Sequence, residues 1–244
     1  MVKMITKLFV YQFLCLVTFS ILECHRLDTR LEMPITDIEK TDEYICSSFL
    51  LEDIEEGYYV SMNFTVDETQ IHHLSTGICE EPLSHEKTWS CAKTQGANCK
   101  GAAVNLGGWD QFTTDKGKIF FPEGLSIKVG SKTKLKYFIM EVHYRNILKA
   151  SEQNKPSAAV TLRLTDKPSA LYYQMYQLTN SGYIPANKPE GHFSETACEW
   201  TRPAVKLYKY SGHTHHHGVL AEAFLVRNKT WTFLGSLKSH MKTK

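Results

Sequence analysis

The sequence lacks an excess of charge of either sign. It contains 28 Lys and Arg residues against 26 Asp and Glu residues among 244, and no basic run occurs along the chain. Proteins that bind nucleic acids or anionic membranes through electrostatics carry clustered Lys and Arg residues. We therefore expect no nucleic-acid partner and no polybasic membrane contact.

Long hydrophobic runs are equally scarce. The single extended one, residues 8–22, follows two lysines and gives way to polar sequence. It is shorter than the ~20 residues of a comfortable membrane span, so we interpret residues 1–24 as a secretory signal peptide, cleaved after Cys24 or after Ser20. An uncleaved anchor is the alternative. After cleavage we expect no stable membrane span and a location in the secretory pathway, a secretory granule or the extracellular space.

The cysteines have no CxxC spacing, which disfavours a thiolate zinc site. With cleavage after Cys24, the remaining cysteines are Cys46, Cys79, Cys91, Cys99 and Cys198. Four of them fall close together in a secreted context, where disulfides are expected, and they allow three pairings. Cys198 then has no partner.

Two sequons, at Asn63 and Asn228, predict surface glycosylation in the same compartment.

Helical periodicity is nearly absent, and short runs rich in β-branched and aromatic residues predict strands instead. These runs are 44–51, 58–66, 70–78, 118–121, 125–129, 135–144, 158–164, 171–178, 205–210 and 219–226. The pattern is typical of antiparallel β-sandwiches. The polar segment 148–157 shows no apolar alternation and is interpreted as a linker between a first domain, 25–147, and a second, 158–244.

Histidines in three clusters are the most informative residues that the chain does contain. Neutral imidazole is the commonest transition-metal ligand. His213 and His215 are two residues apart, so a strand would place both on one face, although a solvated His-rich turn is an alternative. His72 and His73 are adjacent and would face apart on a regular strand. Binding one metal together therefore requires a β-bulge, and we predict irregular backbone at this pair.

The third cluster is a single residue, His143, in the predicted strand 135–144. Side chains alternate between the two faces of a strand, so Phe138 and Met140 share the more apolar face, which we assign to the core. His143 and Glu141 then lie on the opposite face, near a domain surface. A buried, hydrogen-bonded histidine is the alternative interpretation.

Several motifs together resemble the peptidylglycine α-hydroxylating monooxygenase family of copper enzymes. They occur in the order found in that family, from about Leu27 to about Leu237. The matching stretches are Tyr44-Ile45-Cys46, Ile71-His72-His73, Gly77-Ile78-Cys79, Trp89-Ser90-Cys91, 138–144, His213-Thr214-His215-His216, Val226-Arg227-Asn228 and Trp231-Thr232.

The resemblance implies ligands for two copper sites. His72, His73 and His143 match the ligands of the family's first copper, and His213 and His215 match two ligands of its second copper. The family completes the second site with a methionine further along. Imidazole and thioether ligands accommodate both Cu(I) and Cu(II), which suits single-electron chemistry.

The resemblance also implies a fold and a reaction. The fold is all-β, with two antiparallel β-sandwich, jelly-roll-like domains and disulfides Cys46–Cys91 and Cys79–Cys99. In the family, ascorbate reduces both coppers, and O2 is used to hydroxylate the α-carbon of the C-terminal glycine of glycine-extended peptides. This is the first step of peptide amidation.

The chain departs from the family in its second half. Met241 is the only methionine after the His-x-His pair, and its surroundings do not resemble the family's ligand segment. We therefore expect the second domain to be incomplete and the methionine ligand to be missing. The resemblance implies that Ser211 stands where the family has a carboxylate-binding arginine and that Glu141 stands where it has a glutamine. We also expect Cys198 to lack the partner that the corresponding family cysteine has.

These departures leave alternatives to the peptide monooxygenase. One is a secreted copper-binding, catalytically impaired truncated form of the same enzyme. Another is a dopamine β-monooxygenase-like hydroxylase, whose signature overlaps at 141–144. The run at 213–216 favours the peptide enzyme.

Overall fold

The computed structural model describes residues 26–91, 98–110, 117–176, 178, 180, 182–201, 204–210 and 218–238. The chain divides into two compact units, unit 1 before Leu178 and unit 2 from Leu178 onward, and each is described by itself. No helix among the described residues is long and apolar enough to cross a membrane.

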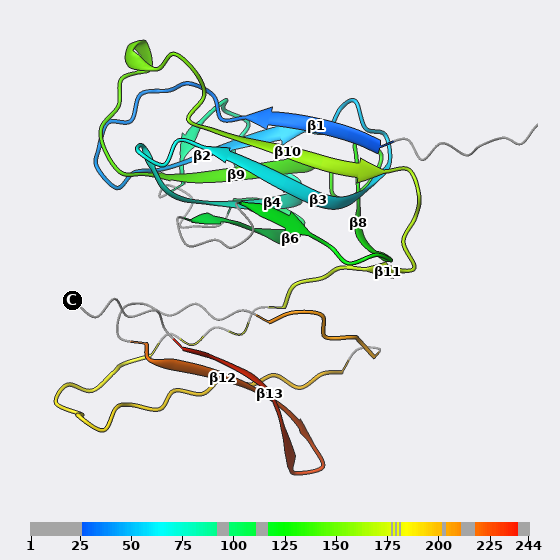
Figure 1. The fold of residues 1–244 in the computed structure, drawn as a ribbon, viewed down its shortest axis with the longest axis vertical. Coiled ribbons are helices and arrows are strands. Elements are labelled where there is room, and N and C mark those ends of the chain that lie inside the picture. The colour runs from blue at the N-terminus through cyan, green and yellow to red at the C-terminus, as the bar shows by residue number, and fades with distance from the viewer. Residues whose placement is uncertain are drawn as a thin grey trace, which may run out of the picture. The chain divides into compact units, whose positions relative to one another are not determined.

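Two sheets make up unit 1 (Figure 1). The first has the order β1-β10-β3-β8-β11, with β7 also paired to β3. Its strands are β1 (Arg26–Glu32), β3 (Gly57–Val66), β7 (Lys118–Phe120), β8 (Leu125–Val129), β10 (Ala158–Thr165) and β11 (Leu171–Tyr172). All pairs are antiparallel except the short β8–β11 pair.

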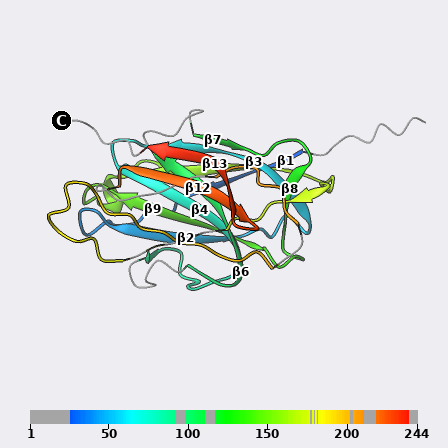
Figure 2. The same cartoon turned by 90° about the horizontal axis from the view of Figure 1, so that it is seen from below.

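The second sheet carries the elements that matter most for the candidate site. It has the order β5-β2-β9-β4-β6, and every pair in it is antiparallel. Its strands are β2 (Tyr44–Leu50), β4 (Ile71–Pro82), β5 (Trp89–Ser90), β6 (Cys99–Asp110) and β9 (Tyr137–Tyr144). Figure 2 shows β2, β9 and β4 side by side. The expected all-β, antiparallel fold class is confirmed.

The core of unit 1 combines side chains from both sheets. Leu162 and Tyr59 come from the first sheet, Phe138 and Met140 from the second, and all four are at most 1% exposed. Burying side chains of this size stabilises the fold by about 1.5–3 kcal/mol each. The assignment of Phe138 and Met140 to the core face of their strand is confirmed, which leaves the opposite face of β9 for His143.

Both disulfides implied by the resemblance are present. Cys46 and Cys91 are bonded with their Cα atoms 5.4 Å apart, and Cys79 and Cys99 with theirs 5.9 Å apart. The first ties β2 to the segment that follows β5. The second ties β4 to β6, its neighbour in the sheet. Together they hold the sheet that carries the histidines.

The domain boundary differs from the expected one. We expected a linker at 148–157 and a second domain from Ala158, but the strand that begins at Ala158 is β10, which lies between β1 and β3 in unit 1. The division falls at Leu178 instead. The physical reason is that β10 is buried on its inner face, with Val160 and Leu162 inside the core. The polar segment 148–157 is therefore a connection within unit 1.

Several strands also differ from the sequence predictions. The predicted strand at 205–210 is wrong, because no strand is assigned there, and the one at 171–178 is limited to β11. Conversely, β1 and β6 were not predicted. β6 contains three glycines and lies at a sheet edge, with most of its side chains at least partly exposed, so it has little apolar alternation. Pairing with a neighbouring strand, rather than local propensity, defines it.

Unit 2 contains a β-hairpin, β12 (Leu220–Arg227) and β13 (Thr230–Lys238). Asn228 and Lys229 connect the strands and have φ angles of 48° and 63°, as a type I′ turn requires at both central positions. Asn228 is exposed, as is Asn63 on β3, so both sequons are on the surface of their units. β13 was not predicted.

Candidate metal centre

The sheet pairing brings the first two histidine clusters together. His72 and His73 lie on β4 and His143 lies on the neighbouring strand β9. His73 is the register partner of His143, and directly paired residues in adjacent strands point to the same face. Residues 70 positions apart in sequence therefore meet on one face of the sheet.

The predicted irregular backbone at the histidine pair is confirmed. Ile71 pairs with Tyr144 and His73 pairs with His143, so His72 is an extra residue without a register partner on β9. This two-against-one pairing is a β-bulge. A regular strand would turn His72 away from His73, whereas the bulge lets both imidazoles reach the same point.

Hydrogen bonds from the residue after β9 hold the bulge. The Arg145 side chain donates from Nε to the Ile71 carbonyl oxygen over 3.1 Å. The Arg145 backbone N–H donates to the Gln70 carbonyl oxygen over 2.8 Å. Before the bulge, Asp67 accepts hydrogen bonds from the backbone and the hydroxyl of Thr69 and closes a turn. The backbone entering β4 is thus fixed from both sides.

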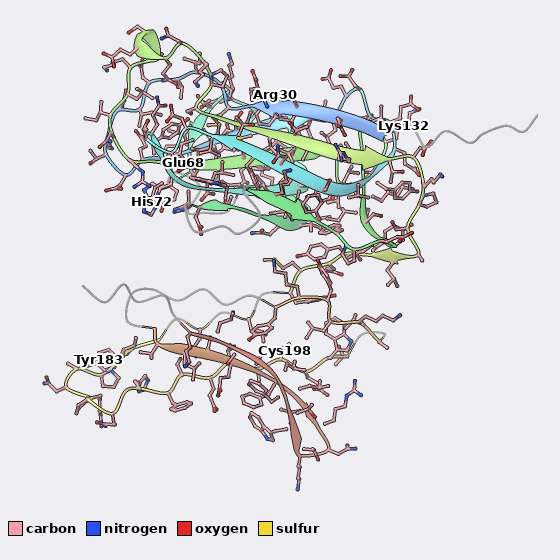
Figure 3. The ribbon with its side chains drawn as sticks, viewed as in Figure 1. Arg30, Glu68, His72, Lys132, Tyr183 and Cys198 are labelled. Carbon is pink, nitrogen blue, oxygen red and sulfur yellow. A yellow bond between two sulfur atoms is a disulfide. The ribbon has the colours of Figure 1, made fainter. Side chains whose placement is uncertain are left out.

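The three imidazoles converge through their Nδ1 atoms. His72 Nδ1 and His73 Nδ1 are 3.0 Å apart, and His73 Nδ1 and His143 Nδ1 are 3.4 Å apart. One nitrogen from each ring lies within 4.8 Å of the others. His143 is 8% exposed and His73 is half-buried. His72, labelled in Figure 3, is exposed. Among the three ligands, His72 is therefore the one most accessible to solvent.

Tyr44, half-buried at the start of β2, packs against one of the three histidines. Its ring stacks on His143 with centroids 4.0 Å apart and an interplanar angle of 10°. Burial, followed by the nearby carboxylates of Glu141 and Asp42, raises the pKa of Tyr44. The phenol thus stays neutral and serves as a wall that fixes the orientation of the His143 ring.

The surroundings of His143 favour its neutral form. Burial is the main cause that lowers its pKa, with a smaller contribution from His72, while Asp42 acts in the opposite direction. Asp42 Oδ1 lies 3.3 Å from His143 Nε2. A neutral imidazole offers a lone pair to a metal, and a protonated one does not.

The donor set fits a transition metal. Three imidazole nitrogens without a carboxylate or thiolate among them suit copper, which accepts nitrogen ligands in both of its common oxidation states. A second group, Cys46, Cys91 and Glu141, also has its potential ligand atoms close together. Its two sulfurs are joined in a disulfide, so it has no thiolate to offer a metal.

Other predicted site residues lie outside the described part of the chain. His213 and His215, proposed for a second copper, fall in 211–217, and Met241 falls in 239–244. Cys198 is described, and it is exposed and in no disulfide. The described residues thus bear on the first histidine site alone.

A family model described as copper type II ascorbate-dependent monooxygenase, N-terminal domain, matches residues 29–151, about half of the chain. The chain belongs to this family. The matched residues include all three converging histidines and all four disulfide-bonded cysteines. The family expected from the sequence motifs is confirmed, and the histidine cluster lies in the part that defines it.

Relatives point to the same family over a longer stretch. A peptidyl-glycine alpha-amidating monooxygenase of Mus musculus is 29% identical over 211 residues, which cover 86% of this chain and 20% of the relative. The corresponding protein B of Xenopus laevis is 27% identical, with 86% and 23% covered. That of Rattus norvegicus is 27% identical over 209 residues, with 86% and 21% covered. The chain thus spans about a fifth to a quarter of these relatives' length.

Sequence reasoning missed three residues around the site. Tyr44 was part of a matching motif, but its contact with His143 depends on the register between β2 and β9. Asp42 and Arg145 lie in connections outside the strands, where no periodicity marks them. The proximity of Arg145 to His143 in sequence was the one available signal.

Proposed function

We propose that His72, His73 and His143 bind one copper ion through their Nδ1 atoms. The observation that carries the proposal is the convergence of these three nitrogens within the family's N-terminal domain. Copper, when bound, supplies one-electron redox chemistry. The protein's own contribution is to hold the ligands in place through the bulge at His72, the Arg145 hydrogen bonds and the Tyr44 stack.

We further propose that this chain takes part in hydroxylating the α-carbon of the C-terminal glycine of secreted peptides. The relatives' names, peptidyl-glycine alpha-amidating monooxygenase, support this substrate class. Ascorbate is the proposed reductant, O2 the proposed oxidant, and His213 and His215 the proposed ligands of a second copper. A monooxygenase inserts one oxygen atom of O2 into a C–H bond and reduces the other to water with two electrons, which ascorbate can supply.

The proposed location is the secretory pathway. Two disulfides support an oxidising compartment, because such bonds are rare in the cytosol. The apolar stretch in residues 1–24 supports a cleaved signal peptide. The exposed positions of Asn63 and Asn228 support glycosylation at both sequons.

The test is a turnover assay on the purified full chain loaded with copper. With ascorbate, O2 and a glycine-extended peptide, the protein should release the hydroxyglycine product, detected by mass spectrometry. Activity should disappear without ascorbate and in a His72→Ala/His73→Ala variant. Absence of product from a folded protein that contains two copper ions would refute the proposed reaction.

A second candidate function is copper binding without turnover. It is favoured by the observation that all three ligands of the first site lie within unit 1. Metal analysis distinguishes the two functions. One tightly held copper per chain together with no product supports binding alone, whereas two coppers and product formation support the monooxygenase.

A further inference from the structure

Asp42 occupies a strained position beside the candidate copper site. It lies in the connection before β2 with a φ angle of 55°, in the left-handed region, which is uncommon for residues other than glycine although asparagine and aspartate adopt it more often than most. Its backbone N–H donates to the Arg145 carbonyl oxygen over 3.4 Å. Backbone strain of this kind costs about 1 kcal/mol or more and persists where the surroundings require it.

The strained backbone points the Asp42 carboxylate at the far side of the His143 ring. Asp42 Oδ1 is 3.3 Å from His143 Nε2, while His143 Nδ1 faces His73 on the opposite side of the ring. The His143 side chain is only 10% exposed, whereas the Asp42 side chain is 78% exposed. An exposed carboxylate thus contacts a nearly buried imidazole. Each ring nitrogen of His143 therefore faces a different environment.

His143 Nε2 has no other partner among the described residues. The atom is buried, and no contact to it meets the full angular requirements of a hydrogen bond, that to Asp42 included. The distance to Asp42 exceeds the usual upper limit of about 3.2 Å only slightly. Because the exposed Asp42 carboxylate lies 3.3 Å from this nitrogen, we assign it as the acceptor. A buried N–H without an acceptor would cost about 1–3 kcal/mol.

This arrangement selects one of the two neutral forms of the ring. A neutral imidazole carries a proton on one nitrogen and a lone pair on the other. If Nε2 donates to a carboxylate, Nδ1 carries the lone pair. Nδ1 is the atom that converges with those of His72 and His73.

We propose that Asp42 is a positioning residue that holds His143 with its proton on Nε2 and its Nδ1 lone pair directed at the metal. The inference rests on the proposed copper site at His72, His73 and His143. Carboxylates behind histidine ligands fix ring orientation and increase ligand basicity, and their removal weakens metal binding by about 10–100-fold. Asp42 performs this role from outside the strands that carry the ligands.

Two substitutions separate positioning from backbone effects. In Asp42→Gly the carboxylate is lost, which costs stability, but glycine adopts a positive φ without strain. These two effects are of similar size and opposite sign, so the thermal stability of the metal-free fold should change little. In Asp42→Asn the acceptor oxygen is kept without the charge, and asparagine tolerates this backbone region. The exposed Glu68, four residues before His72, provides a matched control (Figure 3). Glu68→Gln removes a nearby charge, and in the described part of the chain no hydrogen bond joins this carboxylate to the histidines.

The experiment is a competition titration of Cu(II) into the full chain, with electron paramagnetic resonance of the bound ion. Asp42→Gly should bind copper at the first site about 10–100-fold more weakly and alter its spectrum. Asp42→Asn should recover a substantial part of the affinity, and Glu68→Gln should match the wild type.

Three results would overturn the inference. They are wild-type affinity in Asp42→Gly, a loss that Asp42→Asn does not relieve, and a loss accompanied by an equal fall in the thermal stability of the metal-free protein. If the wild type itself binds no copper at this site, the proposed function fails instead. The two failures are therefore distinguishable.

Discussion

Removing His72 tests the metal site with the least disturbance of the fold. His72 is an exposed ligand on the bulge of β4, so its replacement by alanine should change the stability of the metal-free protein by no more than about 0.5 kcal/mol. His85 is another exposed histidine of unit 1, with 61% of its side chain accessible, and lies outside the cluster. His85→Ala is therefore the matched control.

The expected magnitude follows from the number of ligands. Structural metal sites with four ligands release about 10–16 kcal/mol on binding, or about 3 kcal/mol per ligand, so loss of one imidazole should weaken binding on the order of 100-fold. At free copper of about 100 times the wild-type Kd, binding stabilises the native protein by about 2.7 kcal/mol. For a chain of this size that raises Tm by about 5–10 °C.

His72→Ala should lose most of this increase. At the same copper concentration its stabilisation should fall to about 0.4 kcal/mol, or about 1–2 °C in Tm. The assay is calorimetry with and without copper, in a His213→Ala/His215→Ala background so that the first site alone contributes. The reasoning is refuted if copper raises Tm of His72→Ala as much as that of the parent, or if His85→Ala loses the increase equally.

Three further predictions concern acidity, the disulfides and the bulge. Because burial lowers the pKa of His143, the unfolded chain binds more protons than the native one just below the ordinary histidine value of about 6.5. Apo stability and copper affinity should therefore both fall as the pH drops through this value; copper affinity that stays flat from pH 7.5 to 5 in titrations would exclude histidine ligation. The loops closed by the disulfides span 45 and 20 residues, so removing Cys46–Cys91 should cost about 4 kcal/mol and removing Cys79–Cys99 about 3 kcal/mol in urea denaturation. A larger cost for the shorter loop would contradict the entropic origin of this estimate. Arg145→Ala should leave the Ile71 carbonyl without its side-chain donor and weaken copper binding, while Arg145→Lys should retain part of it; equal affinities in all three proteins would remove Arg145 from the account.

The part of the site that could be predicted from the sequence is the part set by local spacing. Adjacent histidines cannot share a face of a regular strand, so the hypothesis that His72 and His73 bind one metal together predicted the bulge. The same alternation placed Phe138 and Met140 in the core and His143 on the other face. The contact between His143 and His73 depends on the register between β4 and β9. Local spacing does not determine this register, and only the resemblance implied that the two histidines meet.

The parts that could not be predicted depend on long-range pairing. β10 follows a polar connection, and nothing local indicates that it lies between β1 and β3. The edge strand β6 carries small and exposed residues, so its pattern is that of a loop. Asp42 and Arg145 act from connections, where their positions are set by a strained backbone and by contacts across the sheet.

X-ray absorption at the copper edge tests the central claim most directly. In protein loaded with Cu(I), with His213 and His215 replaced by alanine, the account predicts a first shell of imidazole nitrogens that disappears when His72, His73 and His143 are all replaced. A spectrum dominated by sulfur, or one that is unchanged in the triple variant, would show that these histidines do not hold the metal.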